Sequence, residues 1–216
     1  MSRYKTLLFD LDGTLFDSAP GILSSIRFAL DELGIPEPPD MWRFLGPPLF
    51  VSLKEFCGLD DEKAWDVVGI YREKYPTDEY IFNASVFDGV EEILKELKAA
   101  GLTLAVATSK PVPFAKKLVE HFGLIEYFDF IGGSGLDNSR GSKREVIEYV
   151  LENLGETDRS SVLMIGDRKH DVLGAKECGL DCLYVLWGYG SSEEAAESGA
   201  FATVVTPREC LEFILG

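Results

Sequence analysis

Two aspartates separated by a single leucine follow the first apolar run of the chain. They belong to the sequence Asp10-Leu11-Asp12-Gly13-Thr14, which comes directly after Leu7-Leu8-Phe9. A short apolar run of this kind predicts a buried parallel strand, and α/β sheets bind ligands at the carboxyl ends of such strands. Two carboxylates at that position can attack an electrophile, carry protons or bind a hard cation.

The same residues also allow a simpler interpretation as a turn. Asp12-Gly13 is a common hairpin turn and would join residues 7–11 to residues 14–16. A turn accounts for Gly13 but not for the second aspartate at the strand end, and the two interpretations are compatible. We therefore keep Asp10 and Asp12 as candidate catalytic residues.

A second acidic element follows another apolar run, at residues 162–165. It contains Asp167 and Asp171, and Asp171 is equally well explained as the N-cap of the next helix, a role that does not exclude contact with a metal. If both strands lie side by side, three or four carboxylates meet and need a compensating cation. The all-oxygen set of donors favours Mg²⁺ and disfavours zinc.

Two further positions offer groups that bind phosphate. Thr108 and Ser109 follow an apolar run at residues 102–107, where their hydroxyl and backbone N–H groups can donate to phosphoryl oxygens, although such residues often only cap a helix. Lys143 begins a predicted helix, and most lysines in that position are solvated surface charges. We keep Lys143 as a candidate because a phosphate site among carboxylates needs a cation.

The elements that must position these residues alternate along the chain. Helical patterns separate the apolar runs and fill residues 90–98, 112–122, 143–154 and 171–178. This repetition predicts an α/β fold with a doubly wound, Rossmann-like parallel sheet. The predicted strands are residues 6–11, 102–108, 128–132, 162–166, 182–187 and 202–205.

Residues 17–82 break this alternation, because they contain no convincing strand and read as several helices. The first helix carries an apolar stripe, Ile22, Ile26, Leu30 and Leu33, and stops at Gly34. We therefore expect an all-helical domain, residues 17–82, inserted into a core made of residues 1–16 and 83–216. The inserted domain is expected to cover the ligand crevice of the core.

Composition excludes several classes of protein. The 216 residues are 46% hydrophobic, and 37 acidic against 21 basic residues give a net charge of −16. This charge repels nucleic acids and anionic membranes, so neither is an expected partner, and an anionic substrate would need a metal or local positive charge. The four cysteines and two histidines have no zinc spacing, and no apolar run approaches the ~20 residues of a membrane span. We expect a cytoplasmic protein with reduced thiols.

Over essentially its whole length the sequence resembles the haloacid dehalogenase superfamily of phosphatases. Asp17-Ser18 and the following insert, up to Phe87-Asp88-Gly89-Val90, look like the helical cap of the phosphoglycolate phosphatase-like branch. Other stretches are similar to members named phosphoglycolate phosphatases or 5′-nucleotidases. The superfamily's four motifs are matched in order by Asp10-Leu11-Asp12-Gly13-Thr14, Thr108, Lys143, and Gly166-Asp167 with Asp171.

The third motif departs from the common pattern of this branch. Lys-Pro is frequent there, whereas this chain has Gly141-Ser142-Lys143, so Arg140 or Arg144 could take the cationic role. The position of Lys143 before an apolar helix matches the family, and we keep it as the expected cation.

The resemblance implies a magnesium-dependent hydrolase of phosphomonoesters that acts on a small phosphorylated metabolite. Asp10 would be the nucleophile that forms an aspartyl-phosphate, and Asp12 the general acid and base. The helical cap would close over the leaving group and set specificity. Phosphate would be bound by Thr108, Ser109 and Lys143, and Mg²⁺ by Asp10, the carbonyl of Asp12, Asp167 and Asp171.

Several alternatives remain at this point. Phosphoglycolate, a nucleoside monophosphate, as in a 5′-nucleotidase, and pyrophosphate are all candidate substrates, and a monomer or a homodimer is expected. A sugar-phosphate mutase would use the same core residues. A dehalogenase needs neither the second aspartate nor magnesium, and a non-catalytic phosphate-binding protein is expected to lack a motif residue, whereas none is missing. Possible pocket cations in the insert are Arg27, Arg43, Lys54 and Arg72.

Overall fold

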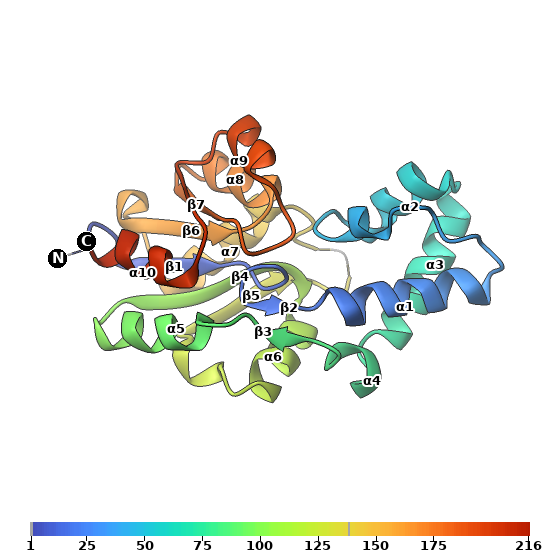
Figure 1. The fold of residues 1–216 in the computed structure, drawn as a ribbon, viewed down its shortest axis with the longest axis horizontal. Helices are drawn as coiled ribbons and strands as arrows, with labels where there is room; N and C mark the ends of the chain where they lie inside the picture. The colour runs from blue at the N-terminus through green and yellow to red at the C-terminus, as the bar shows by residue number, and fades with distance from the viewer. Residues whose placement is uncertain (1, 138) are drawn as a thin grey trace. The chain divides into compact units, whose positions relative to one another are not determined.

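The computed structural model describes residues 2–137 and 139–216 (Figure 1). The chain forms two compact units. The first consists of Met1–Asp17 together with Val86–Gly216, and the second is the segment Ser18–Ser85 that is inserted between those two stretches. Two short strands, β2 (Phe16–Asp17) and β3 (Ser85–Val86), pair where the chain leaves the first unit and returns to it.

A six-stranded sheet forms the centre of the first unit, and its strand pairs are parallel. The predicted doubly wound α/β fold is confirmed. In spatial order the strands are β5 (Phe130–Ser134), β4 (Thr103–Pro111), β1 (Thr6–Phe9), β6 (Val162–Gly166), β7 (Asp181–Val185) and β8 (Ala202–Val204).

Strand β1 lies in the middle of this sheet and is buried along its whole length. Phe9 pairs with Val106 of β4 on one side and with Ile165 of β6 on the other. The hairpin interpretation of the first motif is therefore wrong, because both neighbours of β1 run parallel to it. The register also brings the carboxyl ends of β4, β1 and β6 together at one edge of the sheet.

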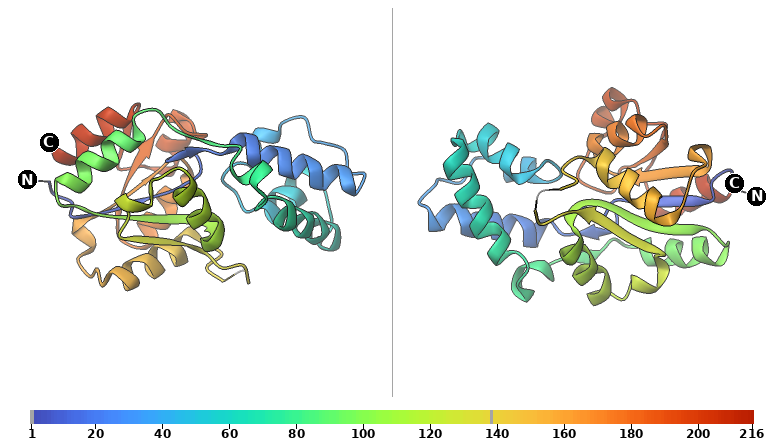
Figure 2. Two further views of the ribbon diagram at one scale, coloured as in Figure 1. Left: turned by 90° about the horizontal axis from the view of Figure 1, so that it is seen from below. Right: turned by 180° about the vertical axis from the view of Figure 1, so that it is seen from behind.

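Helices lie on both faces of the sheet (Figure 2). Apolar residues of α7 and α8, including Val146, Val150 and Val172, pack against Leu8 and Met164 of the sheet in one buried cluster. The helices of this unit are α5 (Val90–Ala99), α6 (Val112–His121), α7 (Lys143–Leu154), α8 (Lys169–Glu177), α9 (Ser192–Ser198) and α10 (Pro207–Leu215), with 3₁₀ turns at Ile125–Tyr127 and Arg159–Ser161.

The inserted unit is helical. Ile22, Ile26 and Leu30 are buried on its first helix, as the stripe predicts, but Leu33 is 41% exposed because the helix ends at Glu32. Gly34 then turns the chain with a φ of 62°. The helices are α1 (Ala19–Glu32), α2 (Leu49–Cys57), α3 (Asp61–Lys74) and α4 (Asp78–Ile81), with a 3₁₀ turn at Met41–Phe44.

Within the described ranges, no helix combines the length and the apolar character that a bilayer crossing requires. The four cysteines are free thiols, and three of them, Cys178, Cys182 and Cys210, are buried.

Candidate active site

Asp10 and Asp12 lie in a tight turn that begins where β1 ends. The Asp10 N–H continues the sheet by donating to Ile165 O at 2.9 Å, and the turn closes when Gly13 N donates to Phe16 O at 2.8 Å. Gly13 has a φ of 86°, and a Cβ there would stand 2.1 Å from Asp167 Oδ2. Only glycine lets the turn approach the neighbouring acidic element this closely.

Asp167 follows the last residue of β6, and Asp171 lies in the first turn of α8. Both side chains are buried. Helix α8 begins at Lys169, two residues earlier than predicted, and its N-cap is Arg168. Asp171 is therefore not the N-cap; it lies in the first turn, where its Oδ2 accepts a hydrogen bond from Arg168 N at 3.1 Å. This bond orients the Asp171 carboxylate toward the strand ends.

Three of the carboxylates form one cluster. Asp10, Asp167 and Asp171 each offer an oxygen, and these oxygens lie within 4.8 Å of one another. Burial, followed by the negative charges of its neighbours, raises the pKa of Asp167 well above its ordinary value. Burial likewise raises the pKa of Asp171 to about 6, against the opposing effect of the Lys143 ammonium. The cluster therefore favours a bound cation.

Lys143 is buried beside this cluster. Its Nζ lies 2.8 Å from Asp10 Oδ1 and 2.6 Å from Asp171 Oδ1, and it donates to Ala107 O at 2.8 Å. Burial alone would lower the pKa of Lys143, but the two carboxylates outweigh it and raise that pKa above its ordinary value. The interpretation of Lys143 as a solvated surface charge is wrong.

The serine before Lys143 explains the unusual third motif. Ser142 is the N-cap of α7: its Oγ accepts from Glu145 N at 3.2 Å, and Glu145 Oε2 accepts from Ser142 N at 3.0 Å. This capping box places Lys143 in the first turn of the helix. The neighbouring arginines lie elsewhere, since Arg140 Nε donates to Gly133 O at 2.8 Å and Arg144 is exposed.

The end of β4 supplies Thr108, Ser109 and Lys110. The strand runs on to Pro111, which is the N-cap of α6, so Thr108 and Ser109 do not cap that helix. Thr108 is buried, its Oγ1 accepts a hydrogen bond from Lys110 N at 3.2 Å, and Ser109 is exposed. The pairing with β5 shifts register between Thr108 and Pro111.

Lys110 is a buried cation to which the sequence interpretation gave no role. Its Nζ lies 3.0 Å from Asp12 Oδ2, and its side chain is only 4% exposed. The available signal was its position immediately after Thr108-Ser109 at a strand end. Its side chain is buried like that of Thr108, two residues earlier, whereas Ser109 between them is exposed, but the sequence does not show that its ammonium meets Asp12.

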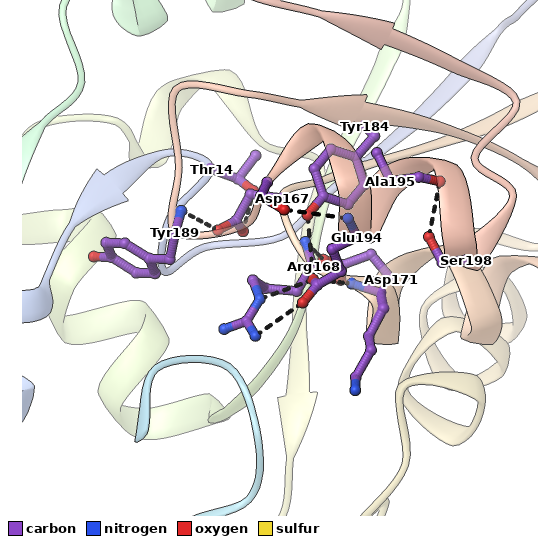
Figure 3. A network of polar contacts seen from close by, with 11 residues as sticks. Thr14, Asp167, Arg168, Asp171, Tyr184, Tyr189, Glu194, Ala195 and Ser198 are labelled. Atoms are coloured by element: carbon purple, nitrogen blue, oxygen red, sulfur yellow. Dashed lines mark hydrogen bonds and ion pairs between the residues drawn. The ribbon is translucent and has the colours of Figure 1, made fainter. Parts of the chain in front are cut away.

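The loop after β7 contacts the Asp167 carboxylate (Figure 3). Tyr189 N donates to Asp167 Oδ2 at 2.8 Å, and Thr14 Oγ1 donates to Asp167 Oδ1 at 3.1 Å. Trp187 Nε1 donates to Thr14 O at 3.0 Å, which ties the loop to the first motif. Both oxygens of Asp167 thus accept a hydrogen bond while remaining in the acidic cluster.

Glu194 of α9 holds the segment between the two aspartates (Figure 3). Its Oε1 accepts from Arg168 Nε at 3.0 Å, from Lys169 N at 2.7 Å and from Tyr184 OH at 3.2 Å. Its Oε2 accepts from Arg168 Nη2 at 3.2 Å. Burial opposes ionisation of Glu194, but the bonds from Arg168 and Lys169 outweigh it and lower the pKa of this carboxyl.

These donors fit a hard divalent cation. The Oδ1 atoms of Asp10 and Asp171 are buried and accept no well-directed hydrogen bond from the described residues, although Lys143 lies within ion-pair distance. One ammonium cannot neutralise three carboxylates, and every donor in the cluster is oxygen. Hard oxygen donors with excess negative charge suit Mg²⁺ better than zinc.

Comparison with known proteins agrees with this arrangement. The model of the haloacid dehalogenase-like hydrolase family matches residues 7–185, which include every residue of the acidic cluster, Lys110 and Lys143. The chain belongs to this family.

Relatives and solved structures extend the match. A 5′-nucleotidase of Pseudomonas aeruginosa is 45% identical over 195 residues, covering 89% of this chain and 87% of that protein. The tyrosine-protein kinase PtkA of Mycobacterium tuberculosis is 42% identical over 202 residues, 93% of this chain and 67% of the kinase. A phosphoglycolate phosphatase of Aquifex aeolicus is 31% identical over 188 residues, 86% of each chain.

The crystal structure of a predicted phosphatase from Clostridium acetobutylicum superposes with a TM-score of 0.93 at 41% identity, over 99% of both chains. The chain is thus a phosphatase of the haloacid dehalogenase type, a family that acts on small phosphorylated substrates.

Proposed function

We propose that the chain hydrolyses small phosphomonoesters with Mg²⁺, through an aspartyl-phosphate on Asp10. The observation that carries this proposal is the arrangement around Asp10. Its carboxylate shares Lys143 with Asp171 and lies in the three-aspartate cluster, while Asp12 stands in the same turn outside that cluster. This arrangement supports Asp10, beside the Lys143 ammonium and the proposed metal ligands, as the nucleophile, and Asp12, outside the acidic cluster, as the group that carries protons.

In the first step a carboxylate oxygen of Asp10 attacks phosphorus in line with the ester oxygen. The new O–P bond forms as the bond between phosphorus and the ester oxygen breaks, and Asp12 gives its proton to the departing alkoxide. In the second step Asp12 takes a proton from water while the water oxygen attacks the aspartyl-phosphate. Inorganic phosphate leaves and Asp10 is regenerated.

The phosphate would be held by the end of β4 and by Lys143. Thr108 and Ser109 supply hydroxyl and backbone N–H donors at the strand end, and the Lys143 ammonium supplies positive charge beside the attacking carboxylate. Such fixed donors stabilise the charge that spreads over the equatorial oxygens in the transition state.

The metal would be held by Asp10, the carbonyl of Asp12, Asp167 and Asp171. A bound Mg²⁺ supplies charge neutralisation between the phosphate and the carboxylate nucleophile. The protein's own part is to hold Asp167 through Thr14 and the Tyr189 N–H, so that its carboxylate keeps a fixed orientation.

The first candidate substrate is a nucleoside monophosphate. This choice rests on the 5′-nucleotidase relative, which is 45% identical, whereas the phosphoglycolate phosphatase relative is 31% identical. Phosphoglycolate is the second candidate. We further propose that the inserted helical unit acts as a cap domain that selects the leaving group, and that the enzyme works in the cytoplasm as a monomer or homodimer.

A substrate panel tests this proposal. Phosphate release is measured from nucleoside monophosphates, phosphoglycolate, sugar phosphates and pyrophosphate, with Mg²⁺ and with chelator, using the wild type and Asp10→Asn. We expect magnesium-dependent turnover of one class of ester and its loss in the variant. Equal release by both proteins would contradict a nucleophilic Asp10.

The panel also includes ATP with a tyrosine peptide, because one relative is named a tyrosine-protein kinase. Transfer of phosphate to the peptide, with no hydrolysis of any ester, would overturn the proposed hydrolase.

A further inference from the structure

The side chain of Lys110 is nearly inaccessible, and its ammonium lies against the second aspartate of the first motif. Lys110 Nζ is 3.0 Å from Asp12 Oδ2, and the lysine side chain is 4% exposed against 22% for the aspartate. We propose that Lys110 is a positioning residue, which holds one oxygen of Asp12 so that the other is presented to the leaving group. This inference rests on the proposed function.

The local structure of β4 directs this side chain. The register of the β4–β5 pair shifts between Thr108 and Pro111, and the Lys110 N–H donates to Thr108 Oγ1 at 3.2 Å. Thr108 and Lys110 are both buried while Ser109 between them is exposed, the alternation that places residues two apart on the same face of a strand. Thr108 and Lys110 are therefore fixed together, with the threonine near the expected phosphate and the lysine on Asp12.

The ion pairs described at the site involve two buried lysines. Lys143 pairs with Asp10 and Asp171, whereas Lys110 pairs with Asp12. Burying a lysine ammonium is costly unless it is paired, so a lysine with only a packing role would be a poor choice at this position. Each of the two aspartates of the first motif thus has a buried lysine beside it, and only the Asp10 carboxylate belongs to the acidic cluster.

Orientation of Asp12 matters most when the leaving oxygen is strongly basic. When the bond between phosphorus and an alkyl ester oxygen breaks, the electron pair stays on that oxygen, which needs the Asp12 proton as it departs. A 4-nitrophenolate leaves without a proton. Loss of a residue that orients Asp12 should therefore slow cleavage of alkyl esters far more than cleavage of 4-nitrophenyl phosphate.

The test measures the first chemical step in single turnovers, with enzyme in excess, for the full chain with Mg²⁺. The probes are 4-nitrophenyl phosphate and the best alkyl phosphate of the substrate panel. The variants are Lys110→Met, Lys110→Arg and, as a matched control, Lys116→Met, which removes an exposed lysine of α6. Melting temperatures show whether each variant is folded.

We expect Lys110→Met to slow alkyl ester cleavage about 100-fold while the rate of 4-nitrophenolate release changes by less than about fivefold. Lys110→Arg should recover part of the alkyl rate, and Lys116→Met should match the wild type. Equal losses with both substrates would overturn the inference. So would an unchanged maximal rate that is reached only at a higher enzyme concentration, which would make Lys110 a phosphate-binding residue.

If Lys110→Met melts at too low a temperature to assay, Lys110→Arg and Lys110→Gln are measured instead. The inference is then judged by the same comparison of the rates of alkyl phosphate and 4-nitrophenyl phosphate cleavage. Absence of turnover in the wild type would instead refute the proposed function, which keeps the two failures distinct.

Discussion

Lys143 shows how one buried side chain can join three strand ends. Its ammonium contacts Ala107 O of β4, Asp10 after β1 and Asp171 after β6. The two aspartates of the first motif and the acidic pair after β6 were predicted from the sequence as candidates, because residue types at strand ends carry a readable signal. Lys143, at the start of a helix, was kept because a phosphate site among carboxylates needs a cation. Lys110 was not predicted, since its contact with Asp12 joins two strand ends that are about a hundred residues apart in the sequence.

Removing the Lys143 ammonium should leave the buried Asp171 carboxylate and the partly buried Asp10 carboxylate without their cation. We expect Lys143→Met to lower the free energy of unfolding by about 3–5 kcal/mol without metal and to abolish most turnover. Urea denaturation and phosphate release measure the two effects.

Arg144→Met is the matched control, because Arg144 is the next residue of the same helix and is exposed. An active Lys143→Met together with an inactive Arg144→Met would reverse the roles given to these two residues.

At the level of elements, the order β4-β1-β6 is what brings the motifs together. The sequence predicted the strands and helices, because alternating apolar runs and helical stripes are local patterns. It did not fix where α8 begins, since the N-cap turned out to be Arg168, whose backbone N–H is bonded by Asp171. The hydrogen bonds that this segment donates to Glu194 of α9 join residues about 25 positions apart, so no local pattern in the sequence indicates them.

Glu194 should act on the metal site through the segment that it holds. Glu194→Gln weakens the bonds to Arg168 and Lys169 N, and we expect the Mg²⁺ concentration for half-maximal activity to rise about 10–100-fold. Turnover at saturating Mg²⁺ should recover.

A magnesium titration of the melting temperature provides a second readout, and Glu193→Gln is the control, because Glu193 is exposed on the same helix. An unchanged Mg²⁺ requirement in Glu194→Gln would show that this carboxylate only supports the fold.

Asp129 links α5, β4 and β5 and gives the fold a defined acid sensitivity. Burial opposes its ionisation, but bonds from Lys98 and Leu104 N outweigh burial and hold the pKa of Asp129 below its ordinary 3.8. A lowered pKa stabilises the folded state above the ordinary value, and this contribution disappears as the pH falls through the folded-state pKa.

We therefore expect Asp129→Asn to cost about 0.5–1 kcal/mol near neutral pH, a modest figure because the Asp129 side chain is 40% exposed. The difference from the wild type should disappear in strong acid. Urea denaturation at both pH values measures it, with exposed Glu126→Gln as the control. A difference that grew in acid would contradict the assignment.

At the scale of the whole molecule, the sequence indicated an α/β sheet with a helical insertion. The alternation of apolar runs and helical patterns is interrupted after the first motif by a segment with helical patterns alone. The sheet unit holds the complete acidic cluster, so metal binding should stabilise the protein without substrate. At about one hundred times its Kd, Mg²⁺ should stabilise the wild type by about 2.7 kcal/mol. Thermal denaturation with and without Mg²⁺ measures this stabilisation, and Asp167→Asn should lose it. A rise in melting temperature as large in Asp167→Asn as in the wild type would place the ion elsewhere.

The most direct test of the central claim is to trap phosphate on Asp10. In Asp12→Asn, 4-nitrophenyl phosphate should still phosphorylate the enzyme, because its leaving group needs no proton, whereas attack by water should stall without the base. Acid-quenched mass spectrometry should then find one phosphoryl group on the peptide that contains Asp10, and none in the Asp10→Asn, Asp12→Asn double variant. Continued turnover with an unmodified Asp10 peptide would contradict the covalent mechanism.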